Sequence, residues 1–139
     1  MVVLLVEDDT MVRLTLADLF EVAGCDFLEA SNAEDAMTIL GDPAQPIDIL
    51  VTDLNLGPGD NGLALAIKGR QRRPELQVVY ETGSPEMLAG RALASWEQVF
   101  RKPFDPMTLA ATVSALSQPR PSGQSAQRRS VESTVASSL

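Results

Sequence analysis

The chain has 139 residues, with 19 acidic and 11 basic side chains, no histidine and one cysteine, and its formal net charge at pH 7 is −8. That length is enough for one domain with its own hydrophobic core. The acidic balance argues against a nucleic-acid surface, the lack of histidine excludes histidine-based catalysis and histidine metal sites in this chain, and the single Cys25 excludes an internal disulfide.

Membrane insertion and secretion are not expected. No apolar run approaches the roughly 18 residues that a membrane-spanning helix needs. The first residues are apolar and are followed at once by acidic side chains, without the basic segment of a signal peptide. We therefore expect a cytoplasmic protein without membrane contact.

Short apolar runs alternate with helical patterns along residues 1–117. Runs rich in Val, Ile and Leu indicate strands, and apolar residues at helical spacing between them indicate helices. The expected strands are 2–6, 26–30, 47–53, 76–80 and 97–101. Five strand–helix units predict an α/β fold with a doubly wound, five-stranded parallel sheet and helices on both faces.

Several residues mark where the helices begin and which side they bury. Asp9 immediately precedes the first helical pattern and is the best candidate for its cap, and Ser31 or Asn32 caps the second. Ile67 is expected to face inward on the third helix. Ser84, with a proline after it, predicts the N-terminus of a short fourth helix.

Composition changes near residue 118. Residues 118–139 are rich in Ser, Gln, Pro and Arg, and their larger apolar side chains are Val131, Val135 and Leu139. Such a segment cannot bury a core, so we expect a folded domain over 1–117 and a flexible extension over 118–139. A marginal helix over 130–139 stays open.

Polar side chains follow four of the expected strands. Glu7 and Asp8 follow the first, Asp53 ends the third, Thr82 follows the fourth and Lys102 follows the fifth. The carboxyl ends of parallel strands meet at one edge of a sheet, where open α/β proteins bind their ligands. We therefore expect these five side chains to lie close together.

Three carboxylates at one edge repel one another, and each would resist ionisation. A hard divalent cation such as Mg²⁺ resolves this, and with Lys102 the charges sum to zero. This electrostatic arrangement suits phosphoryl transfer, with Asp53 as the nucleophile that forms an acyl phosphate. The backbone carbonyl of Asn55, in the loop after Asp53, could complete the metal shell.

These motifs resemble the response-regulator receiver domain of two-component signalling, over residues 1 to about 117. The matching segments are Leu5-Val6-Glu7-Asp8-Asp9, Val51-Thr52-Asp53, Thr82-Gly83 and Lys102-Pro103-Phe104. The resemblance implies a flavodoxin-like sheet in order 2-1-3-4-5, Mg²⁺ binding, and a phosphoryl donor histidine on a histidine kinase or histidine phosphotransfer protein.

The resemblance also assigns roles to single residues. Glu7 and Asp8 match the metal acids, and Asp53 matches the phosphorylated residue. Thr82 matches the hydroxyl that senses the phosphoryl group, and Lys102 matches the cation that contacts it. The output implied is a contact with a downstream protein whose identity the sequence does not give, and a homodimer stays open.

The chain departs from the family pattern at two places. Val99 stands three positions before Lys102, where the family usually has an aromatic residue that couples to the Thr. The usual output switch therefore lacks its ring. The loop over 57–62 is about one residue longer than the common form, and no effector domain is recognisable in the tail.

Three other functions compete with the phosphoacceptor. A degenerate receiver could serve only as a docking module, which Val99 leaves open. An aspartate-nucleophile phosphatase needs an acid two residues after Asp53, and Asn55 stands there. A flavin carrier needs a phosphate-binding loop after the first strand, but three acids occupy it. We expect a signalling protein with at most slow self-dephosphorylation, and no turnover enzyme.

Overall fold

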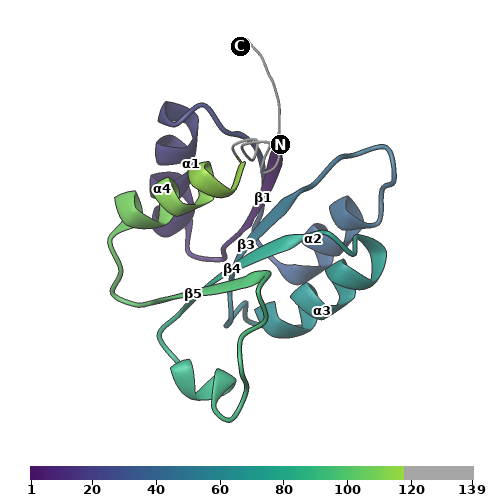
Figure 1. Ribbon diagram of the computed structural model, residues 1–139, viewed down its shortest axis with the longest axis vertical. Coiled ribbons are helices and arrows are strands. Elements are labelled where there is room, and N and C mark those ends of the chain that lie inside the picture. The colour runs from purple at the N-terminus through teal and green to yellow at the C-terminus, as the bar shows by residue number, and fades with distance from the viewer. Residues whose placement is uncertain (118–139) are drawn as a thin grey trace, which may run out of the picture.

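A computed structural model describes residues 1–117, and its centre is a five-stranded parallel sheet (Figure 1). The strand order is β2-β1-β3-β4-β5, which confirms the predicted order. The strands are β1 (Val2–Val6), β2 (Asp26–Ala30), β3 (Ile49–Asp53), β4 (Gln77–Thr82) and β5 (Glu97–Arg101). The expected extension over 118–139 lies outside the described residues.

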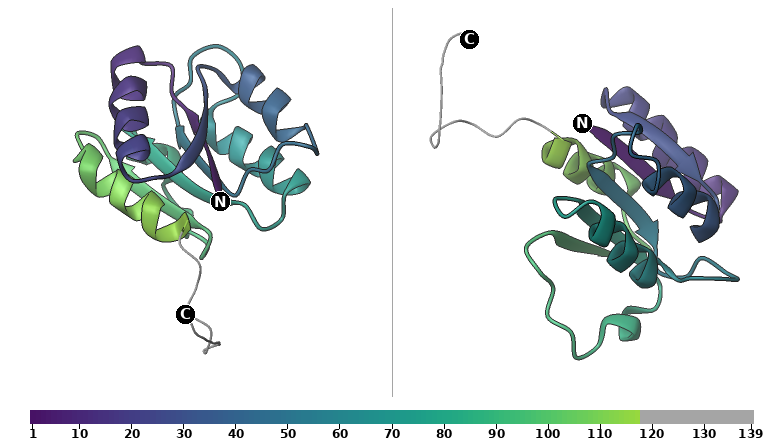
Figure 2. Two further views of the ribbon diagram at one scale, coloured as in Figure 1. Left: turned by 90° about the horizontal axis from the view of Figure 1, so that it is seen from above. Right: turned by 90° about the vertical axis from the view of Figure 1, so that its right-hand side faces the viewer.

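Helices cover both faces of the sheet, as the alternating pattern predicts. They are α1 (Thr10–Val22), α2 (Ala33–Leu40), α3 (Gly62–Arg72) and α4 (Pro106–Ser117). Figure 2 shows α1 and α4 together on one side of the sheet and α2 and α3 on the other. No helix within residues 1–117 is long and apolar enough to cross a membrane.

Each face of the sheet has its own hydrophobic cluster. Leu5 and Val51 pack with α1 and α4, whereas Leu4 and Leu50 pack with α2 and α3. All four side chains are fully buried, because the central strands are covered on both faces. Side chains alternate along a strand, so this pattern fixes the face from which each side chain at a strand end projects.

Helix caps follow the sequence closely. The side chain of Asp9 accepts hydrogen bonds from the backbone amides of Met11 and Val12, and that of Asn32 accepts one from Asp35. Gly24 follows α1 with φ of 78°, a conformation in which a β-carbon would be strained. The predicted capping roles of Asp9 and Asn32 are thus confirmed.

One local prediction is wrong. Ile67 is 47% exposed, and Leu65 and Ala66 occupy the inward positions of α3. The predicted short helix after Ser84 is present as a 3₁₀ helix over Pro85–Leu88 (η1) with Ser84 at its N-cap, although the Ser84 side chain makes no capping hydrogen bond. The helix ends because Ala89 already has an extended conformation, with φ of −61° and ψ of 139°.

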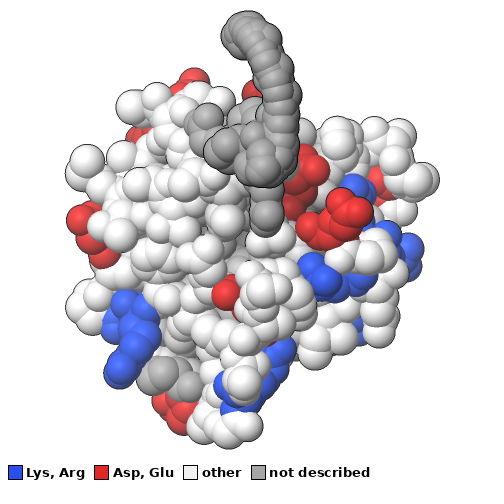
Figure 3. All heavy atoms as spheres, viewed as in Figure 1, with Lys and Arg blue, Asp and Glu red and all other residues white. Residues whose placement is uncertain are grey.

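Basic side chains at the end of α3 serve the fold. Arg73 donates hydrogen bonds to the carbonyl oxygens of Leu40 and Asp42 after α2, and Arg70 lies 4.1 Å over the ring of Trp96. On the face drawn in Figure 3, basic and acidic side chains gather in separate small groups. This face presents no continuous basic surface of the kind that nucleic acid needs.

Candidate functional site

Four charged side chains form one row at the carboxyl ends of neighbouring strands. Each stands two positions after a residue of the hydrophobic cluster that packs with α1 and α4. All four side chains therefore project from the face of the sheet that α1 and α4 cover. Asp53 and Glu81 are direct register partners across β3 and β4. In strand order the row is Glu7, Asp53, Glu81 and Lys102.

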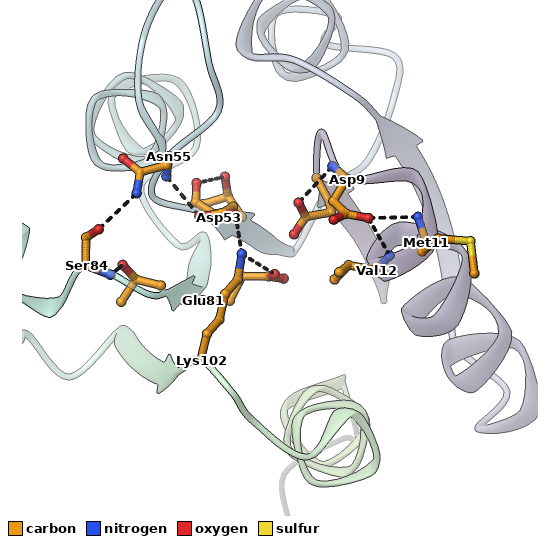
Figure 4. Close-up of polar contacts among 11 residues, drawn as sticks. Asp9, Met11, Val12, Asp53, Asn55, Glu81, Ser84 and Lys102 are labelled. Atoms are coloured by element: carbon orange, nitrogen blue, oxygen red, sulfur yellow. Dashed lines mark hydrogen bonds and ion pairs between the residues drawn. The ribbon is translucent and has the colours of Figure 1, made fainter.

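Asp53 lies at the centre of this row, and only 4% of it is exposed. Its Oδ2 is 2.5 Å from Nζ of Lys102, and its Oδ1 accepts a hydrogen bond of 2.9 Å from the backbone amide of Asn55 (Figure 4). One oxygen therefore faces a cation and the other a neutral donor. The two contacts fix the orientation of the carboxylate, and Lys102 balances its charge.

The acidic surroundings of Lys102 favour the charged form of its ammonium. Burial acts to lower the pKa of its ammonium, but the hydrogen bond that Lys102 donates to Asp53 and the nearby negative charges outweigh burial and raise the pKa. The ammonium therefore stays charged over the whole neutral range. The sequence predicted that Lys102 lies among the strand-end acids, and the geometry agrees.

Glu7 is fully buried, at the end of β1. Its Oε2 accepts a hydrogen bond of 3.0 Å from the backbone amide of Asp9, while its Oε1 has no partner among the described residues. Burial raises the pKa of the Glu7 carboxyl, although its hydrogen bonds and Lys102 act in the opposite direction. Because Oε1 has no hydrogen-bond partner within residues 1–117, it is the oxygen of Glu7 that is free to accept a ligand.

Glu81 is the residue that the sequence analysis missed. It is fully buried, neither carboxylate oxygen has a hydrogen-bond partner among the described residues, and Oε1 is 3.9 Å from Nζ of Lys102. Burial, with Glu7 beside it, raises its pKa to about 10. A carboxylate that directly precedes Thr82 inside an apolar strand was the signal available in the sequence.

Two of the remaining predicted residues, Asp8 and Asn55, lie at the rim of the row. Asp8 is exposed, and its carboxylate lies beside Gly57 of the loop after β3. The Asn55 side chain is exposed too, and its amide donates a 3.3 Å hydrogen bond to the hydroxyl of Ser84. The expected metal-binding roles of Asp8 and the Asn55 carbonyl stay predictions.

Thr82 is buried at the end of β4, on the opposite side of the strand from Glu81. Its hydroxyl oxygen accepts a 2.8 Å hydrogen bond from the backbone amide of Ser84. The strand thus brings Thr82 to the correct edge, but its recorded partner is Ser84 and not Asp53.

The donor set fits a hard divalent cation. Carboxylate oxygens of Glu7, Asp53 and Glu81 lie within 4.8 Å of one another. Three of the oxygens in this group are buried without any partner among residues 1–117. Unpaired buried carboxylates are costly, and cations such as Mg²⁺ prefer oxygen ligands of this kind.

The fold and this edge define a class: a doubly wound α/β protein with an acidic site and a lysine at the carboxyl ends of its strands. The family model of the response regulator receiver domain matches residues 3–114, so the chain belongs to that family. It is a receiver domain of two-component signalling.

Known proteins agree with this assignment. The chain is 33% identical to the aerobic respiration control protein ArcA of Escherichia coli K12 over 136 residues, which cover 94% of the chain and 55% of ArcA. It spans about half the length of the curated relatives that it matches most strongly.

Solved receiver structures share the fold. The receiver domain of the hybrid histidine kinase CckA has a TM-score of 0.71 at 30% identity, covering 85% of this chain and all of that one. A response regulator receiver protein from Sinorhizobium medicae has a TM-score of 0.73 at 22% identity, covering 84% of this chain and 94% of that one. The second likeness concerns the fold alone.

Proposed function

We propose that this chain is a cytoplasmic phosphoacceptor in which Asp53 takes a phosphoryl group from a histidine of a kinase or phosphotransfer protein. The phosphorylated form alters a contact with a downstream protein. The observation that carries this proposal is the environment of Asp53, a nearly buried carboxylate with Lys102 at 2.5 Å on one oxygen and a backbone amide on the other.

The transfer step uses groups of this chain and one group of the partner. A carboxylate oxygen of Asp53 attacks phosphorus, and the P–N bond to the partner's imidazole breaks. The electron pair stays on the imidazole nitrogen, which takes up a proton, and an acyl phosphate remains on Asp53. These 139 residues contain no histidine, so the donor histidine lies outside them.

Lys102 and Thr82 have different roles in this proposal. The Lys102 ammonium now pairs with Asp53 and can move with the new phosphoryl oxygens, whose charge it offsets. The Thr82 hydroxyl is at the same edge and would exchange its bond with Ser84 for a bond to the phosphoryl group. Both contacts favour the phosphorylated state over the free one.

Glu7, Asp8, Asp53 and the Asn55 carbonyl are the residues that would hold Mg²⁺. Bound there, the ion supplies positive charge against the oxygens of the transferring group. Glu7 is prepared for this role, because the Asp9 amide fixes one of its oxygens and leaves the other unpaired. Asp8 reaches the rim from the next position in the chain.

A turnover phosphatase is not proposed. That chemistry needs a general acid near the nucleophile, and the side chain two residues after Asp53 is the Asn55 amide, which donates to Ser84. One observation favours a second candidate, a docking module that binds its partner whether or not Asp53 is phosphorylated. Val99 replaces the aromatic residue with which such domains usually couple phosphorylation to output.

Phosphorylation by a small donor tests the proposal. Incubation with acetyl phosphate and Mg²⁺ should add one acid-labile, hydroxylamine-sensitive phosphoryl group, measured by intact mass. Asp53→Asn should take up none. Asp60→Asn is the matched control, because Asp60 is a loop carboxylate that pairs with Lys68 at 2.6 Å. Uptake by Asp53→Asn equal to that of the wild type would show that another residue is the acceptor.

A further inference from the structure

Glu81 occupies a position where burying a carboxylate costs free energy. It is fully buried, and its direct neighbour across the β3–β4 register is a second buried acid, Asp53. Neither of its oxygens has a hydrogen-bond partner among residues 1–117. A buried carboxylate without hydrogen bonds persists only where something else compensates it.

The cations within reach do not compensate it. Lys102 is the one basic group recorded within 4.0 Å of Glu81 in residues 1–117, and its closer contact is Asp53, at 2.5 Å against 3.9 Å. One ammonium therefore faces three buried carboxylates, those of Glu7, Asp53 and Glu81. With all three acids ionised, the buried part of the site has −3 from the acids and +1 from Lys102, a sum of −2.

We propose that Glu81 is a direct ligand of the divalent cation, together with Glu7 and Asp53. A single divalent cation brings the buried charge to zero. Oxygens of the three carboxylates already lie within 4.8 Å of one another, and neither oxygen of Glu81 accepts a hydrogen bond within residues 1–117. The inference rests on the proposed function, and it adds a ligand that the strand-end motifs did not include.

Asp8 has a different place in this arrangement. Its side chain is exposed, so water solvates its charge, and it lies outside the group of three buried acids. Asp8 therefore acts at the rim, whereas Glu81 lies within the buried row. Replacing Glu81 should consequently weaken the binding of the cation more than replacing Asp8 does.

Equilibrium binding of Mg²⁺ and Mn²⁺ to the full chain tests this, by calorimetry and by the loss of the free Mn²⁺ paramagnetic resonance signal. Glu81→Gln keeps the shape of the side chain and removes its charge, and we expect about tenfold weaker binding or more. Glu75→Gln is the control, because Glu75 is an exposed residue ahead of β4, away from the row. It should bind like the wild type.

Thermal unfolding gives a second readout that separates a ligand from a structural residue. The metal-induced rise of the melting temperature measures binding to the folded state. It should shrink in Glu81→Gln, whatever happens to the melting temperature without metal. Glu81→Met, whose side chain fills a similar volume, should also show a smaller metal-induced rise. This variant replaces Glu81→Gln in the test if Glu81→Gln does not fold.

The outcomes distinguish the two proposals. If Glu81→Gln or Glu81→Met binds Mn²⁺ within about twofold of the wild type, a ligand role for Glu81 is refuted while phosphorylation of Asp53 stands. If the wild type neither binds a divalent cation nor takes up a phosphoryl group, the proposed function itself fails.

Discussion

Replacing Gly62 by Ala should destabilise the fold, because the new β-carbon would clash with the backbone of Asp53. Gly62 is the first residue of α3, and a β-carbon there would lie 2.1 Å from the carbonyl oxygen of Asp53 and 2.9 Å from its carbonyl carbon. An unstrained carbon–oxygen contact is about 3.3 Å, so the overlap is about 1.2 Å. The atoms concerned belong to the backbone, so rotation of a side chain cannot relieve it.

Two effects with opposite signs compete at this position. Helix propensity favours Ala over Gly by about 1 kcal/mol. Overpacking of a rigid site typically costs about 1–3 kcal/mol, and a clash with backbone belongs at the upper end or above. We therefore expect a net loss of about 2 kcal/mol or more, which for 117 folded residues lowers the melting temperature by roughly 8 °C.

Thermal unfolding followed by circular dichroism measures this loss. Gly83→Ala is the matched control, because the nearest heavy atom to a β-carbon there is Cβ of Lys102 at 4.0 Å, an ordinary contact. It lies at the same edge of the sheet and should cost little. Phosphoryl uptake should fall in Gly62→Ala and persist in Gly83→Ala. A Gly62→Ala protein as stable as the wild type would refute the packing argument.

Three other substitutions have defined outcomes. Lys102→Ala leaves Asp53 and Glu81 without their cation and should lower the free energy of unfolding by about 2 kcal/mol in urea titrations. Tyr80→Phe removes the 2.7 Å hydrogen bond to the buried Glu97 and should cost about 1–2 kcal/mol in the same assay. In metal-free buffer, the stability of the wild type should fall as pH rises from 4.5 to about 10, because folded Glu81 keeps a proton that unfolded Glu81 has lost. Urea titrations across this range should show a flatter profile for Glu81→Gln.

The sequence predicted the sheet well because its signals are local. Short segments with apolar residues mark the strands, and residues such as Asp9 and Asn32 cap helices through contacts two or three positions away. The alternation of strands and helices predicted a parallel sheet, and the family resemblance implied its strand order. The sequence also predicted that Asp53 and Lys102 lie close together, because the carboxyl ends of parallel strands meet at one edge of the sheet.

The failures depend on distant contacts. Ile67 and Leu65 both fit a helical stripe, and the approach of α3 to α2 and the sheet decides that Leu65 is the buried one. Glu81 looks like a residue that ends a strand, and only the register with Asp53 places it inside the site. Such choices require knowledge of which strand positions face each other, and short-range patterns do not contain it.

Tyr80 bears on the aromatic residue that is missing at position 99. It is the register partner of Val99 on the neighbouring strand, and its ring is fully buried. Its hydroxyl donates to Glu97, which Arg91 pairs with at 2.9 Å. The ring that fills this region is thus tied through Glu97 to a half-buried ion pair, and a freely rotating aromatic switch does not fit it. Under the proposed function, a response to phosphorylation at the carboxyl end of β4 would instead begin at Thr82, whose hydroxyl accepts a hydrogen bond from the backbone amide of Ser84 in the loop that follows.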